Sequence, residues 1–401
     1  MNAWITLIGI GEDGLDGISP RARALIDNAE VLVGGERHLG KVGGTAAEKV
    51  AWGKDFDHGV SAIRAHEGKR VVVLASGDPM HFGVGATLSR RFGIEAMETI
   101  PSPSAFSLAA ARLGWSLPDV SCLTVHGRKL EAVNLHLRDQ ARLLILSWDG
   151  TTPAKLAALL SAKGYGASRL HVLEHMGGDD EGHLQAIASE WAQERTADLN
   201  SIGVELSGGD DAAQWSRAAG LPEDAFRHDN MITKREVRAV TIAALAPLPG
   251  ELLWDVGAGS GTVAIEWLRL EPSAKAVAME RSADRAENAR HNADELGVPR
   301  LEVIEGEAPD LFTALEDAPD AIFVGGGVSG ELLSACWQQL KDGGRMVSNA
   351  VTLEGQQALA AFRDQHGGSL TKISISRDGA VGPRSGLRPL MDVWQLRTEK
   401  T

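Results

Sequence analysis

The sequence predicts an α/β protein built from two domains, and three observations lead to this fold class. The chain has 401 residues, which is more than one hydrophobic core usually organises. Short β-rich runs alternate with helical stretches in both halves, as they do in α/β folds. Each half also has its own glycine-rich loop directly after an apolar run, GIGEDG at 9–14 and DVGAGSG at 255–261.

The individual elements can be assigned in chain order. The predicted strands are ITLIGI, EVLVG, RVVVLAS, LTVHG and RLLILS in the first half, and LLWDVG, KAVAME, LEVIEG, AIFVGG and RMVSNA in the second. A helix is predicted to begin near Ser19-Pro20, since serine is a good N-cap and proline a good first residue. The segment MITKREVRAVTIAAL predicts an amphipathic helix that starts near Thr233, with Glu236 completing a capping box.

A linker is predicted between the two halves. The stretch SGGDDAA at 207–213 is small, polar and glycine-rich, which is typical of linkers. We therefore expect a first domain at 1–205, a linker at 206–222 and a second domain at 223–401. No internal repeat is visible, so the two domains are not expected to be copies of each other.

The composition excludes several classes of function. A net charge of −14 argues against a large phosphate-binding surface, so nucleic acid is not an expected partner. Cys122 and Cys336 are the two cysteines, which fits a reducing compartment and excludes a cysteine-based metal cluster. His171 and His175 lie in a segment that reads as strand plus turn, so no metal site is expected. The start has no basic stretch ahead of its apolar run and no apolar run reaches membrane-spanning length, so we expect a cytoplasmic protein without a membrane partner.

The second glycine loop is the more informative of the two. Gly257 and Gly259 let the backbone approach a ligand closely, and Gly261 permits tight packing of the strand on the following helix. The spacing is G-x-G-x-G, which suits a ligand without a pyrophosphate. Glu280 ends the next strand, where an acidic group can accept both hydroxyls of a ribose, and GEAPD at 306–310 could reach an adenine ring. The alternative is a purely structural glycine turn.

These features, in this order, resemble the class I S-adenosylmethionine (SAM) methyltransferases. The resemblance implies a Rossmann-like fold for the second domain. It also implies a SAM site whose residues are Thr233, Asp255, Gly257, Ala258, Gly259, Ser260, Gly261, Glu280, Gly306, Glu307 and Ala308.

The fourth strand of this domain indicates the kind of methyl acceptor. It ends in Gly325, Gly326 and Gly327, without the Asn/Asp-Pro-Pro-aromatic segment of methyltransferases that act on exocyclic amines. We expect these glycines to admit a bulky, flat substrate with a conjugated carbon nucleophile. Catalysis would then be mainly alignment, and no residue is assigned as catalytic.

The first glycine loop matches G-x-G-x-x-G, but its context argues against a dinucleotide. Glu12 and Asp13 lie inside the loop and would repel a pyrophosphate, and the helix begins only near Ser19. Instead, ITLIGIGEDGLDGISPRARALIDNAEVLVGG, VVVLASGDPMHFGVG and IPSPSAFSLAAARLGW together resemble the tetrapyrrole (precorrin) methylase family over residues 3–205. The resemblance implies an α/β fold of two subdomains with SAM in the cleft between them, held by Gly9, Gly11, Ser76, Gly77, Asp78, Pro79, Ser102 and Ser104.

The two halves together resemble bifunctional precorrin methyltransferases of cobalamin (vitamin B12) biosynthesis. This resemblance implies one SAM per domain, methylation of a precorrin macrocycle at C5 by the first domain and at C15 by the second, and decarboxylation of the ring C acetate. It also leads us to expect a homo-oligomer. Two rival interpretations are an RNA or protein methyltransferase with an accessory domain, and a nicotinamide-dependent oxidoreductase.

The carboxylates of such a substrate need cationic partners with good geometry. In the second domain the candidates are Arg377, Arg384 and Arg388, of which the last two lie in the glycine-rich segment GPRSGLRPL. In the first domain they are Arg37, Arg112 and Arg128. Surface solvation is the alternative role for each of them.

Overall fold

The computed structural model describes residues 3–53 and 56–401 and divides into two compact units. Unit 1 comprises residues up to 130 together with 137–213. Unit 2 comprises 131–136 together with 214–401. The division at 213/214 lies inside the segment 206–222 that was predicted as a linker. Both units are α/β, so the predicted fold class is confirmed.

Unit 1 begins with a parallel five-stranded sheet. Its order is β3 (Glu48–Ala51), β2 (Val31–Gly34), β4 (Val71–Ser76), β1 (Ile5–Ile10) and β5 (Met97–Ile100). The helices of this subdomain are α1 (Pro20–Asp27), α2 (Glu36–Lys41), α3 (Phe56–Ala65) and α4 (Gly85–Phe92). The Ser19 hydroxyl accepts a hydrogen bond from the Ala22 N–H, so the predicted cap of the first helix is confirmed.

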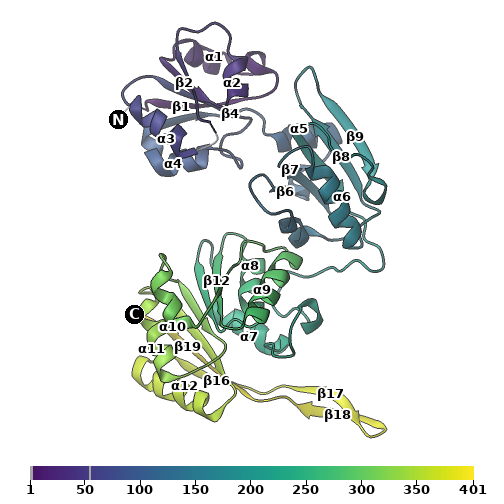
Figure 1. Ribbon diagram of the computed structural model, residues 1–401, viewed down its shortest axis with the longest axis vertical. Coiled ribbons are helices and arrows are strands. Elements are labelled where there is room, and N and C mark those ends of the chain that lie inside the picture. Colours follow the sequence, from purple (N-terminus) through teal and green to yellow (C-terminus); the bar gives the residue numbers. More distant parts are fainter. Residues whose placement is uncertain (1–2, 54–55) are drawn as a thin grey trace. The chain divides into compact units, whose positions relative to one another are not determined.

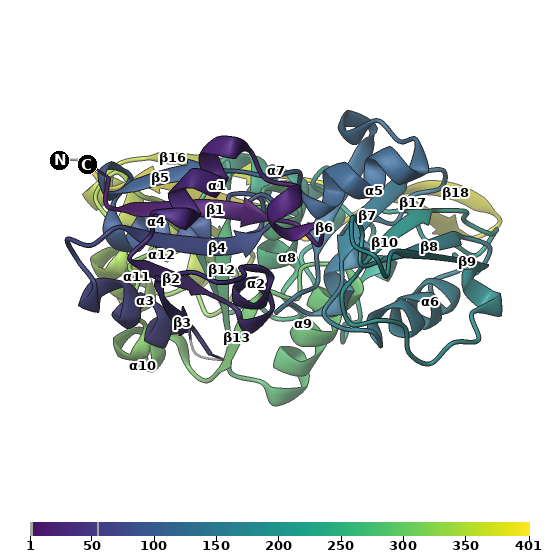
Figure 2. The same cartoon turned by 90° about the horizontal axis from the view of Figure 1, so that it is seen from above.

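A second five-stranded sheet completes unit 1. Its order is β6 (Val120–Thr124), β7 (Arg142–Leu146), β10 (Asn200–Glu205), β8 (Arg169–Glu174) and β9 (Gly182–Ile187), with α5 (Ala105–Leu113) and α6 (Thr152–Ala162) beside it. Strands β6 and β7 are parallel and the other neighbours are antiparallel. In Figures 1 and 2 each of the two sheets of this unit has its own helices beside it.

Unit 2 is built on a seven-stranded sheet. Its order is β13 (Glu302–Glu305), β12 (Lys275–Glu280), β11 (Leu252–Val256), β14 (Ala321–Val324), β15 (Arg345–Ala350), β19 (Val393–Glu399) and β16 (Ser369–Ile373). Its helices are α7 (Arg235–Leu245), α8 (Thr262–Leu270), α9 (Ala283–Glu295), α10 (Ala308–Leu311), α11 (Gly330–Gln339) and α12 (Leu353–His366). The strands from β13 to β15 are parallel, and β19 runs antiparallel to both of its neighbours. The chain order reverses between β11 and β14, which is where open α/β sheets bind their ligands.

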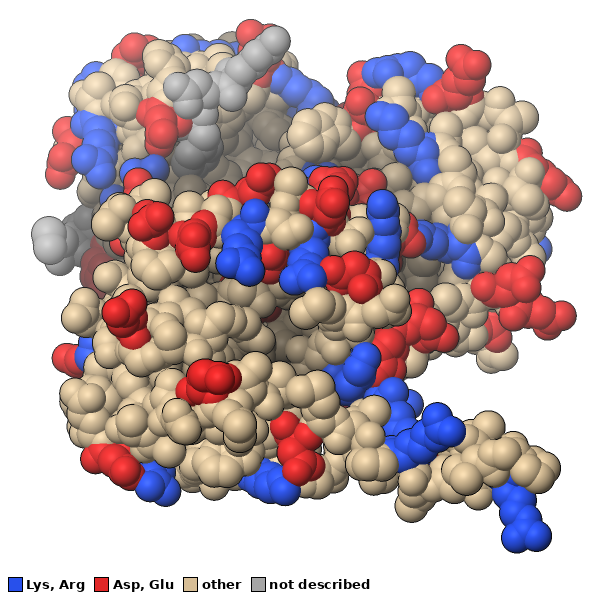
Figure 3. Space-filling view, turned by 60° about the horizontal axis from the view of Figure 1, so that its bottom comes forward, with Lys and Arg blue, Asp and Glu red and all other residues tan. Residues whose placement is uncertain are grey.

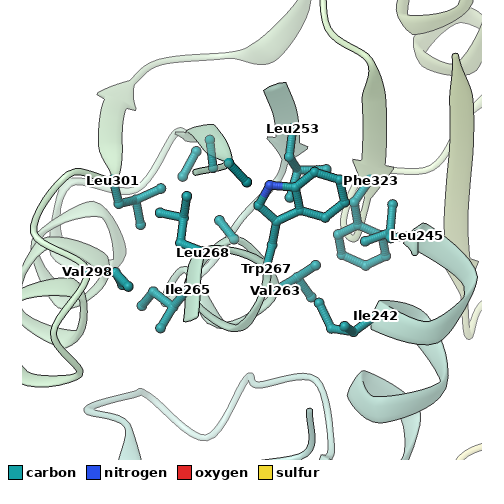
Figure 4. Close-up of a cluster of buried hydrophobic side chains, with 14 of the residues drawn as sticks. Ile242, Leu245, Leu253, Val263, Ile265, Trp267, Leu268, Val298, Leu301 and Phe323 are labelled. Carbon is teal, nitrogen blue, oxygen red and sulfur yellow. The ribbon is translucent and has the colours of Figure 1, made fainter. Parts of the chain in front are cut away.

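One hydrophobic cluster of unit 2 contains a buried indole ring. Trp267 of α8 is fully buried, and its Nε1 donates a hydrogen bond to the Lys275 carbonyl oxygen at 3.1 Å. Figure 4 shows this side chain among Leu253 of β11, Phe323 of β14 and Leu245 of α7. The packing fixes α7 and α8 against the sheet, directly behind the glycine loop that begins α8.

A two-stranded arm extends from the body of unit 2 (Figure 1). It consists of β17 (Ser376–Val381) and β18 (Arg384–Pro389), which pair with each other and with no other strand of the described chain. Leu387 at its surface is 74% exposed. Figure 3 shows basic side chains along this arm.

The predicted capping box at the start of α7 is wrong. The helix begins at Arg235, its N-cap is Lys234, and no side chain caps it. The side chain of Glu236 is instead bound to Arg377, and the carbonyl oxygen of Thr233 accepts a hydrogen bond from Arg238 Nη1. Tertiary partners have therefore replaced the local cap.

The predicted strands can be compared with those of the structure. Each of the ten predicted strand segments overlaps a strand, although LTVHG at 123–127 shares only its first two residues with β6. His175 follows β8 with a φ of +46°, as the strand-plus-turn interpretation requires. Short 3₁₀ helices are Gly14–Asp16, Ile94–Ala96, Leu117–Asp119, Leu130–His136, Ala188–Glu190, Glu223–Ala225 and Phe312–Ala314. Among the helices within 3–53 and 56–401, none combines the length and the apolar character needed to cross a membrane.

Candidate functional sites

The larger cavity lies in unit 2, at the carboxyl ends of the parallel strands, and has a volume of about 1020 Å³. It contains most of the residues predicted for the second domain. Those that line it are Thr233, Gly257, Ala258, Gly259, Ser260, Glu280, Gly306, Glu307, Ala308, Gly325, Gly326 and Gly327. The structure therefore brings together the glycine loop, the ends of the two following strands and the glycines after β14.

The three glycines of the loop all have positive φ, but they do different things. A Cβ on Gly257 would lie 3.1 Å from the backbone nitrogen of Gly326, so the two glycine segments abut there. A Cβ on Gly261 would lie 2.9 Å from the Cβ of Ala289, which is the tight packing predicted for that position. A Cβ on Gly259 would approach only the Met231 carbonyl oxygen, at 3.9 Å, so the space above Gly259 is open.

Glu280 shapes the same loop. Its side chain is buried; Oε2 accepts a hydrogen bond from the Gly259 N–H at 2.8 Å, and Oε1 accepts one from the Ser282 N–H at 3.0 Å. Each carboxylate oxygen can accept a further hydrogen bond. The geometry thus fixes the loop and leaves acceptor capacity for a pair of hydroxyls.

Asp255 and Gly261 do not line the cavity, although both were predicted to bind cofactor. Asp255 is fully buried under the loop, where its Oδ2 accepts a hydrogen bond from the Ala264 N–H at 3.0 Å. Burial raises the pKa of this carboxyl to about 7; the charge of Glu280 adds to the effect and the Ala264 N–H opposes it. Asp255 therefore joins β11 to the first turn of α8 through this hydrogen bond and does not face the cavity.

The arginines predicted to bind substrate in the second domain do not line this cavity either. Arg377 is bound by two carboxylates, at 2.7 Å from Glu223 and closely by Glu236, and these contacts raise its pKa. Arg388 donates a hydrogen bond to the Ala380 carbonyl oxygen, and both it and Arg384 are exposed on the arm. A substrate role for Arg384 and Arg388 therefore stays a prediction that the lining of this cavity does not support.

The structure adds cavity residues that sequence reasoning missed. Three are basic, and one is an amide at the end of β15: Lys234, Arg281, Arg285 and Asn349. Arg285 Nε donates to Asp229 Oδ2 at 2.8 Å. Lys234 and Arg281 directly follow the predicted residues Thr233 and Glu280, so adjacency could have found them, whereas nothing local marks Asn349.

A second cavity, of about 480 Å³, lies between the two subdomains of unit 1. Of the predicted residues, those that line it are Gly11, Arg37, Ser76, Gly77, Asp78 and Ser104. Gly9, Pro79 and Ser102 do not line it, nor do Arg112 and Arg128. The motif segments thus meet at one place, as the family resemblance implied, but not every motif residue faces the space.

Gly9 and Ser102 lie outside the lining of this cavity and are joined to each other by a hydrogen bond. A Cβ on Gly9 would lie 1.8 Å from the carbonyl oxygen of Gly77, so only glycine fits there. The Ser102 hydroxyl donates to the Gly9 carbonyl oxygen at 2.7 Å. Pro79 accepts a hydrogen bond from the Gly85 N–H at 2.8 Å and so helps to begin α4. These residues hold the motif segments together.

Glu12 lines this cavity, and two cations compensate its negative charge, so it would repel an anionic ligand less than the sequence suggested. Its carboxylate is paired with Arg37 and lies 3.3 Å from Lys41 Nζ. Burial raises its pKa, but the two cations outweigh that effect and lower it overall. The helix α1 does begin at Pro20, away from the loop, so that part of the case against a pyrophosphate is confirmed.

Three polar side chains of the unit 1 cavity, Arg37, His38 and Ser76, contact one another. His38 Nε2 and Arg37 Nη2 each lie 2.9 Å from the Ser76 hydroxyl. Burial lowers the pKa of His38 to about 4, and Arg37 adds to the shift, so this imidazole is neutral at pH 7. Outside the cavity, Arg112 makes two hydrogen bonds to Glu181, at 2.7 and 2.8 Å, and Arg128 lies over the Phe82 ring.

Comparisons with known proteins assign each part of the chain to a family. The family described as tetrapyrrole (corrin/porphyrin) methylases matches residues 5–190, and the precorrin methyltransferase domain family matches 224–400. The chain is 45% identical to the precorrin-6Y C(5,15)-methyltransferase (decarboxylating) of Sinorhizobium sp over 397 residues, which cover 98% of this chain and 96% of the relative. The resemblances stated from the sequence are thereby confirmed.

Two shorter relatives match parts of the chain. The cobalt-precorrin-7 C(5)-methyltransferase of Salmonella typhimurium is 32% identical over 177 residues, which cover 44% of this chain and 87% of the relative. The probable cobalt-precorrin-6B C(15)-methyltransferase (decarboxylating) of Saccharolobus solfataricus is 33% identical over 141 residues, which cover 34% of this chain and 71% of the relative.

Proposed function

The chain belongs to the family of precorrin-6Y C(5,15)-methyltransferases (decarboxylating), and from this premise we propose how it divides its work. It is a SAM-dependent enzyme of cobalamin biosynthesis that methylates a precorrin at C5 and C15 and decarboxylates the ring C acetate. Unit 1 methylates C5, unit 2 methylates C15 and removes the carboxyl group, and each unit binds its own SAM. The observation that carries this division is that each unit has a separate cavity built around its own glycine loop. The separate C(5) and C(15) names of the two shorter relatives support it.

The residues of the unit 2 cavity fit a SAM molecule. Ser260 is buried, lines the cavity and has a hydroxyl without a hydrogen-bond partner among the described residues. The open space over Gly259 is a cradle that a side chain would fill. We therefore assign the loop 257–260 to the methionine and ribose portions, Glu280 to the ribose hydroxyls, and Gly306 to Ala308 to the adenine.

Methyl transfer to a conjugated carbon requires little general acid or base catalysis. When bound, SAM supplies an electrophilic methyl group, and the conjugated precorrin carbon supplies the electron pair. The chain contributes backbone that admits the flat macrocycle, at Gly325 to Gly327, and a cavity that aligns the two reactants. In unit 1 the corresponding space is bounded by Gly11, by Ser76 to Asp78 and by Ser104, and Arg37, which is paired with Glu12, is the candidate partner of a substrate carboxylate.

We further propose that the enzyme works in the cytoplasm as a homo-oligomer on a small-molecule substrate, without a nucleic-acid or membrane partner. The net charge of −14 supports the exclusion of nucleic acid, because a polyphosphate would be repelled by most of the surface. Size-exclusion chromatography with light scattering tests the oligomeric state, and a monomeric mass would contradict it.

One experiment tests the division of labour. The full-length protein is incubated with precorrin-6Y and SAM, and the product is analysed by mass spectrometry and NMR. Two methyl additions and loss of one carbon dioxide are expected. Gly259→Val is expected to stop C15 methylation and decarboxylation and to leave C5 methylation intact. Loss of all reactions together in this variant would contradict the division.

The same assay separates the rival functions. Methyl transfer to RNA or protein at rates that exceed transfer to precorrin would favour the first rival. Tight binding of NADPH without binding of S-adenosylhomocysteine, measured by calorimetry, would favour an oxidoreductase and overturn the proposal.

A further inference from the structure

Three polar side chains from distant parts of unit 2 form a network at the wall of its cavity. They are Thr241 of α7, Asn349 of β15 and Gln395 of β19. Thr241 is fully buried and Gln395 is 4% exposed, whereas Asn349 is partly exposed and lines the cavity. Buried polar groups are costly unless they are paired, so a network of this kind holds one arrangement.

The hydrogen bonds determine which way the amide of Asn349 faces. The Thr241 hydroxyl donates to the Val237 carbonyl oxygen at 2.8 Å, so its oxygen can only accept from other partners. It accepts from Asn349 Nδ2 at 2.9 Å and from Gln395 Nε2 at 3.1 Å. Gln395 Nε2 also donates to Asn349 Oδ1 at 2.9 Å. A flipped amide would place the Asn349 oxygen against the Thr241 oxygen, with no proton between them.

This arrangement leaves part of the amide unused. In the part of the chain that the structure describes, Asn349 Nδ2 donates one hydrogen bond, so its second N–H is available in the cavity. The amide thus offers a neutral donor with a fixed direction. Nearly all of its orientation comes from residues that do not line the cavity themselves, since Thr241 and Gln395 lie behind it.

The elements that carry Thr241 and Gln395, α7 and β19, also bring apolar side chains to the cavity. Val237 and Val393 line the cavity and belong to one apolar cluster with Ile373, and Ile375 packs against that cluster and lines the cavity too. Asn349 is the penultimate residue of β15, which lies next to β14 in the sheet, and Gly325–Gly327 directly follow β14. The residues assigned to the ribose and adenine follow β12 and β13, beyond β11 in the sheet, so Asn349 belongs to the methyl-acceptor side.

A neutral donor in an apolar wall suits the loss of a carboxyl group. In that step the bond between the acetate methylene and the carboxylate carbon breaks, carbon dioxide leaves, and the electron pair enters the methylated, positively charged ring. The proton released from C15 as conjugation is restored then completes a methyl group on the former acetate carbon. A cation at the carboxylate would stabilise the charge that must disappear and so slow the step, whereas an amide donor orients the group at less cost.

We propose that Asn349 binds the ring C acetate carboxylate through its free Nδ2 N–H, and that Thr241 and Gln395 are positioning residues that fix this donor. The proposal rests on the proposed function of unit 2. It assigns a substrate contact to a residue on β15, where the exposed arginines of the arm were first expected to provide one.

The test uses the full-length enzyme with precorrin-6Y and SAM, and follows C5 methylation, C15 methylation and carbon dioxide release separately. Asn349→Ala is expected to slow carbon dioxide release roughly tenfold or more relative to C15 methylation, so that a methylated product that keeps its carboxyl group accumulates. Asn349→Asp has the same shape but places a negative charge against the carboxylate, and is expected to be at least as impaired.

Thr241→Val keeps Asn349 but removes the acceptor that orients it. It is expected to change the ratio of decarboxylation to C15 methylation in the same direction by a smaller factor, mainly through kcat. Ser334→Ala on α11 removes an exposed hydroxyl outside the cavity and serves as the matched control, with no change of ratio expected. C5 methylation by unit 1 and the affinity of unit 2 for S-adenosylhomocysteine report whether each variant is folded.

The possible outcomes separate the two levels of inference. An Asn349→Asp enzyme with a normal ratio, or variants in which C15 methylation and decarboxylation fall equally, would overturn the role of Asn349 alone. A wild-type enzyme that neither methylates C15 nor releases carbon dioxide would overturn the proposed function of unit 2, and this assignment with it.

Discussion

Arg238 Nε donates a hydrogen bond to Glu266 Oε1 across 2.6 Å in the core of unit 2, where the side chains are 0% and 2% exposed. The same carboxylate accepts hydrogen bonds from the N–H groups of Gly220 and Leu221, each at 2.8 Å. Arg238 Nη1 donates to the Thr233 carbonyl oxygen at 2.6 Å. The buried ion pair between α7 and α8 therefore binds both ends of the segment 220–233, at Gly220 and Leu221 through Glu266 and at Thr233 through Arg238. The second end, at Thr233, lines the cavity.

Breaking this ion pair is expected to be costly. Glu266→Ala leaves a buried guanidinium and two buried N–H groups without their acceptor, and should lower the free energy of unfolding by about 3–5 kcal/mol. Hydrogen exchange of amides in α7 and α8, with urea unfolding, measures the effect. Lys341→Ala breaks a more exposed pair with Asp320 and should cost less than about 1 kcal/mol. Equal costs for the two variants would contradict the central role of the buried pair.

Substitutions at two glycines of the second loop should affect different properties, ligand binding at Gly259 and stability at Gly261. At Gly259 a side chain meets open space but requires a positive φ, so Gly259→Val should weaken S-adenosylhomocysteine binding to unit 2 at least tenfold, with about 1–2 kcal/mol of backbone strain. At Gly261 a Cβ collides with Ala289, so Gly261→Ala should mainly lower stability. Calorimetry and thermal unfolding of both variants check this contrast, and a reversal of the two effects would refute it.

The raised pKa of Asp255 predicts a specific dependence of stability on pH. The carboxyl has a pKa of about 7 when folded and 3.8 in the reference state, so the native state binds the extra proton between these values. Stability therefore falls as the pH rises from about 4 to about 7, at up to about 1.4 kcal/mol per pH unit. An asparagine side chain in place of this carboxyl would mimic the protonated acid and would not titrate.

The variant that tests this is Asp255→Asn. Compared with the wild type, it should be similar in stability at pH 4 and more stable at pH 8. Chemical unfolding followed across this range gives the difference directly. A difference between the two proteins that does not change with pH would show that the Asp255 carboxyl is already ionised in the folded protein at pH 4.

Two arginines of unit 1 should behave differently although the sequence offered both as substrate ligands. Arg37→Ala removes a cation that lines the cavity and exposes Glu12 to the substrate carboxylates, so the KM for precorrin in C5 methylation should rise roughly tenfold. Arg112→Ala should leave this KM unchanged and cost at most about 1 kcal/mol of stability, because its pair with Glu181 is about one third exposed. Initial rates of both variants decide the matter, and equal KM values would argue against the cavity assignment.

Much of the site could be predicted because its signals are local. Gly261 packs tightly against Ala289, as its place in the loop predicted, and Ser19 caps the helix that it precedes. Strands with continuous apolar runs, such as Ile5–Ile10, were recognised because burial on both faces leaves a plain trace in the sequence. The strands β3, β5, β9 and β10 and the strands β16 to β19 were not predicted. In β16 to β18 most residues are exposed, and polar residues interrupt any apolar run.

The errors share a cause, which is that side chains found partners far away in the chain. Glu236 does not cap α7 and is bound instead to Arg377, 141 residues later in the chain, and Arg377 lies outside the lining of the cavity. Asp255 lies next to the glycine loop in the sequence, yet folding turns it away from the cavity and toward the first turn of α8. The position of a residue next to the glycine loop in the sequence does not determine whether its side chain points into the cavity.

By itself the sequence determined the α/β class and the two glycine loops, which follow from backbone sterics and short-range periodicity. Its motifs also indicated the family, through their resemblance to known methyltransferases. Only the tertiary structure decided which polar groups line each cavity and which lie behind it. Asn349 acquires its direction from Thr241, 108 residues earlier, and from Gln395, 46 residues later. Such partnerships arise only when packing brings distant strands and helices together.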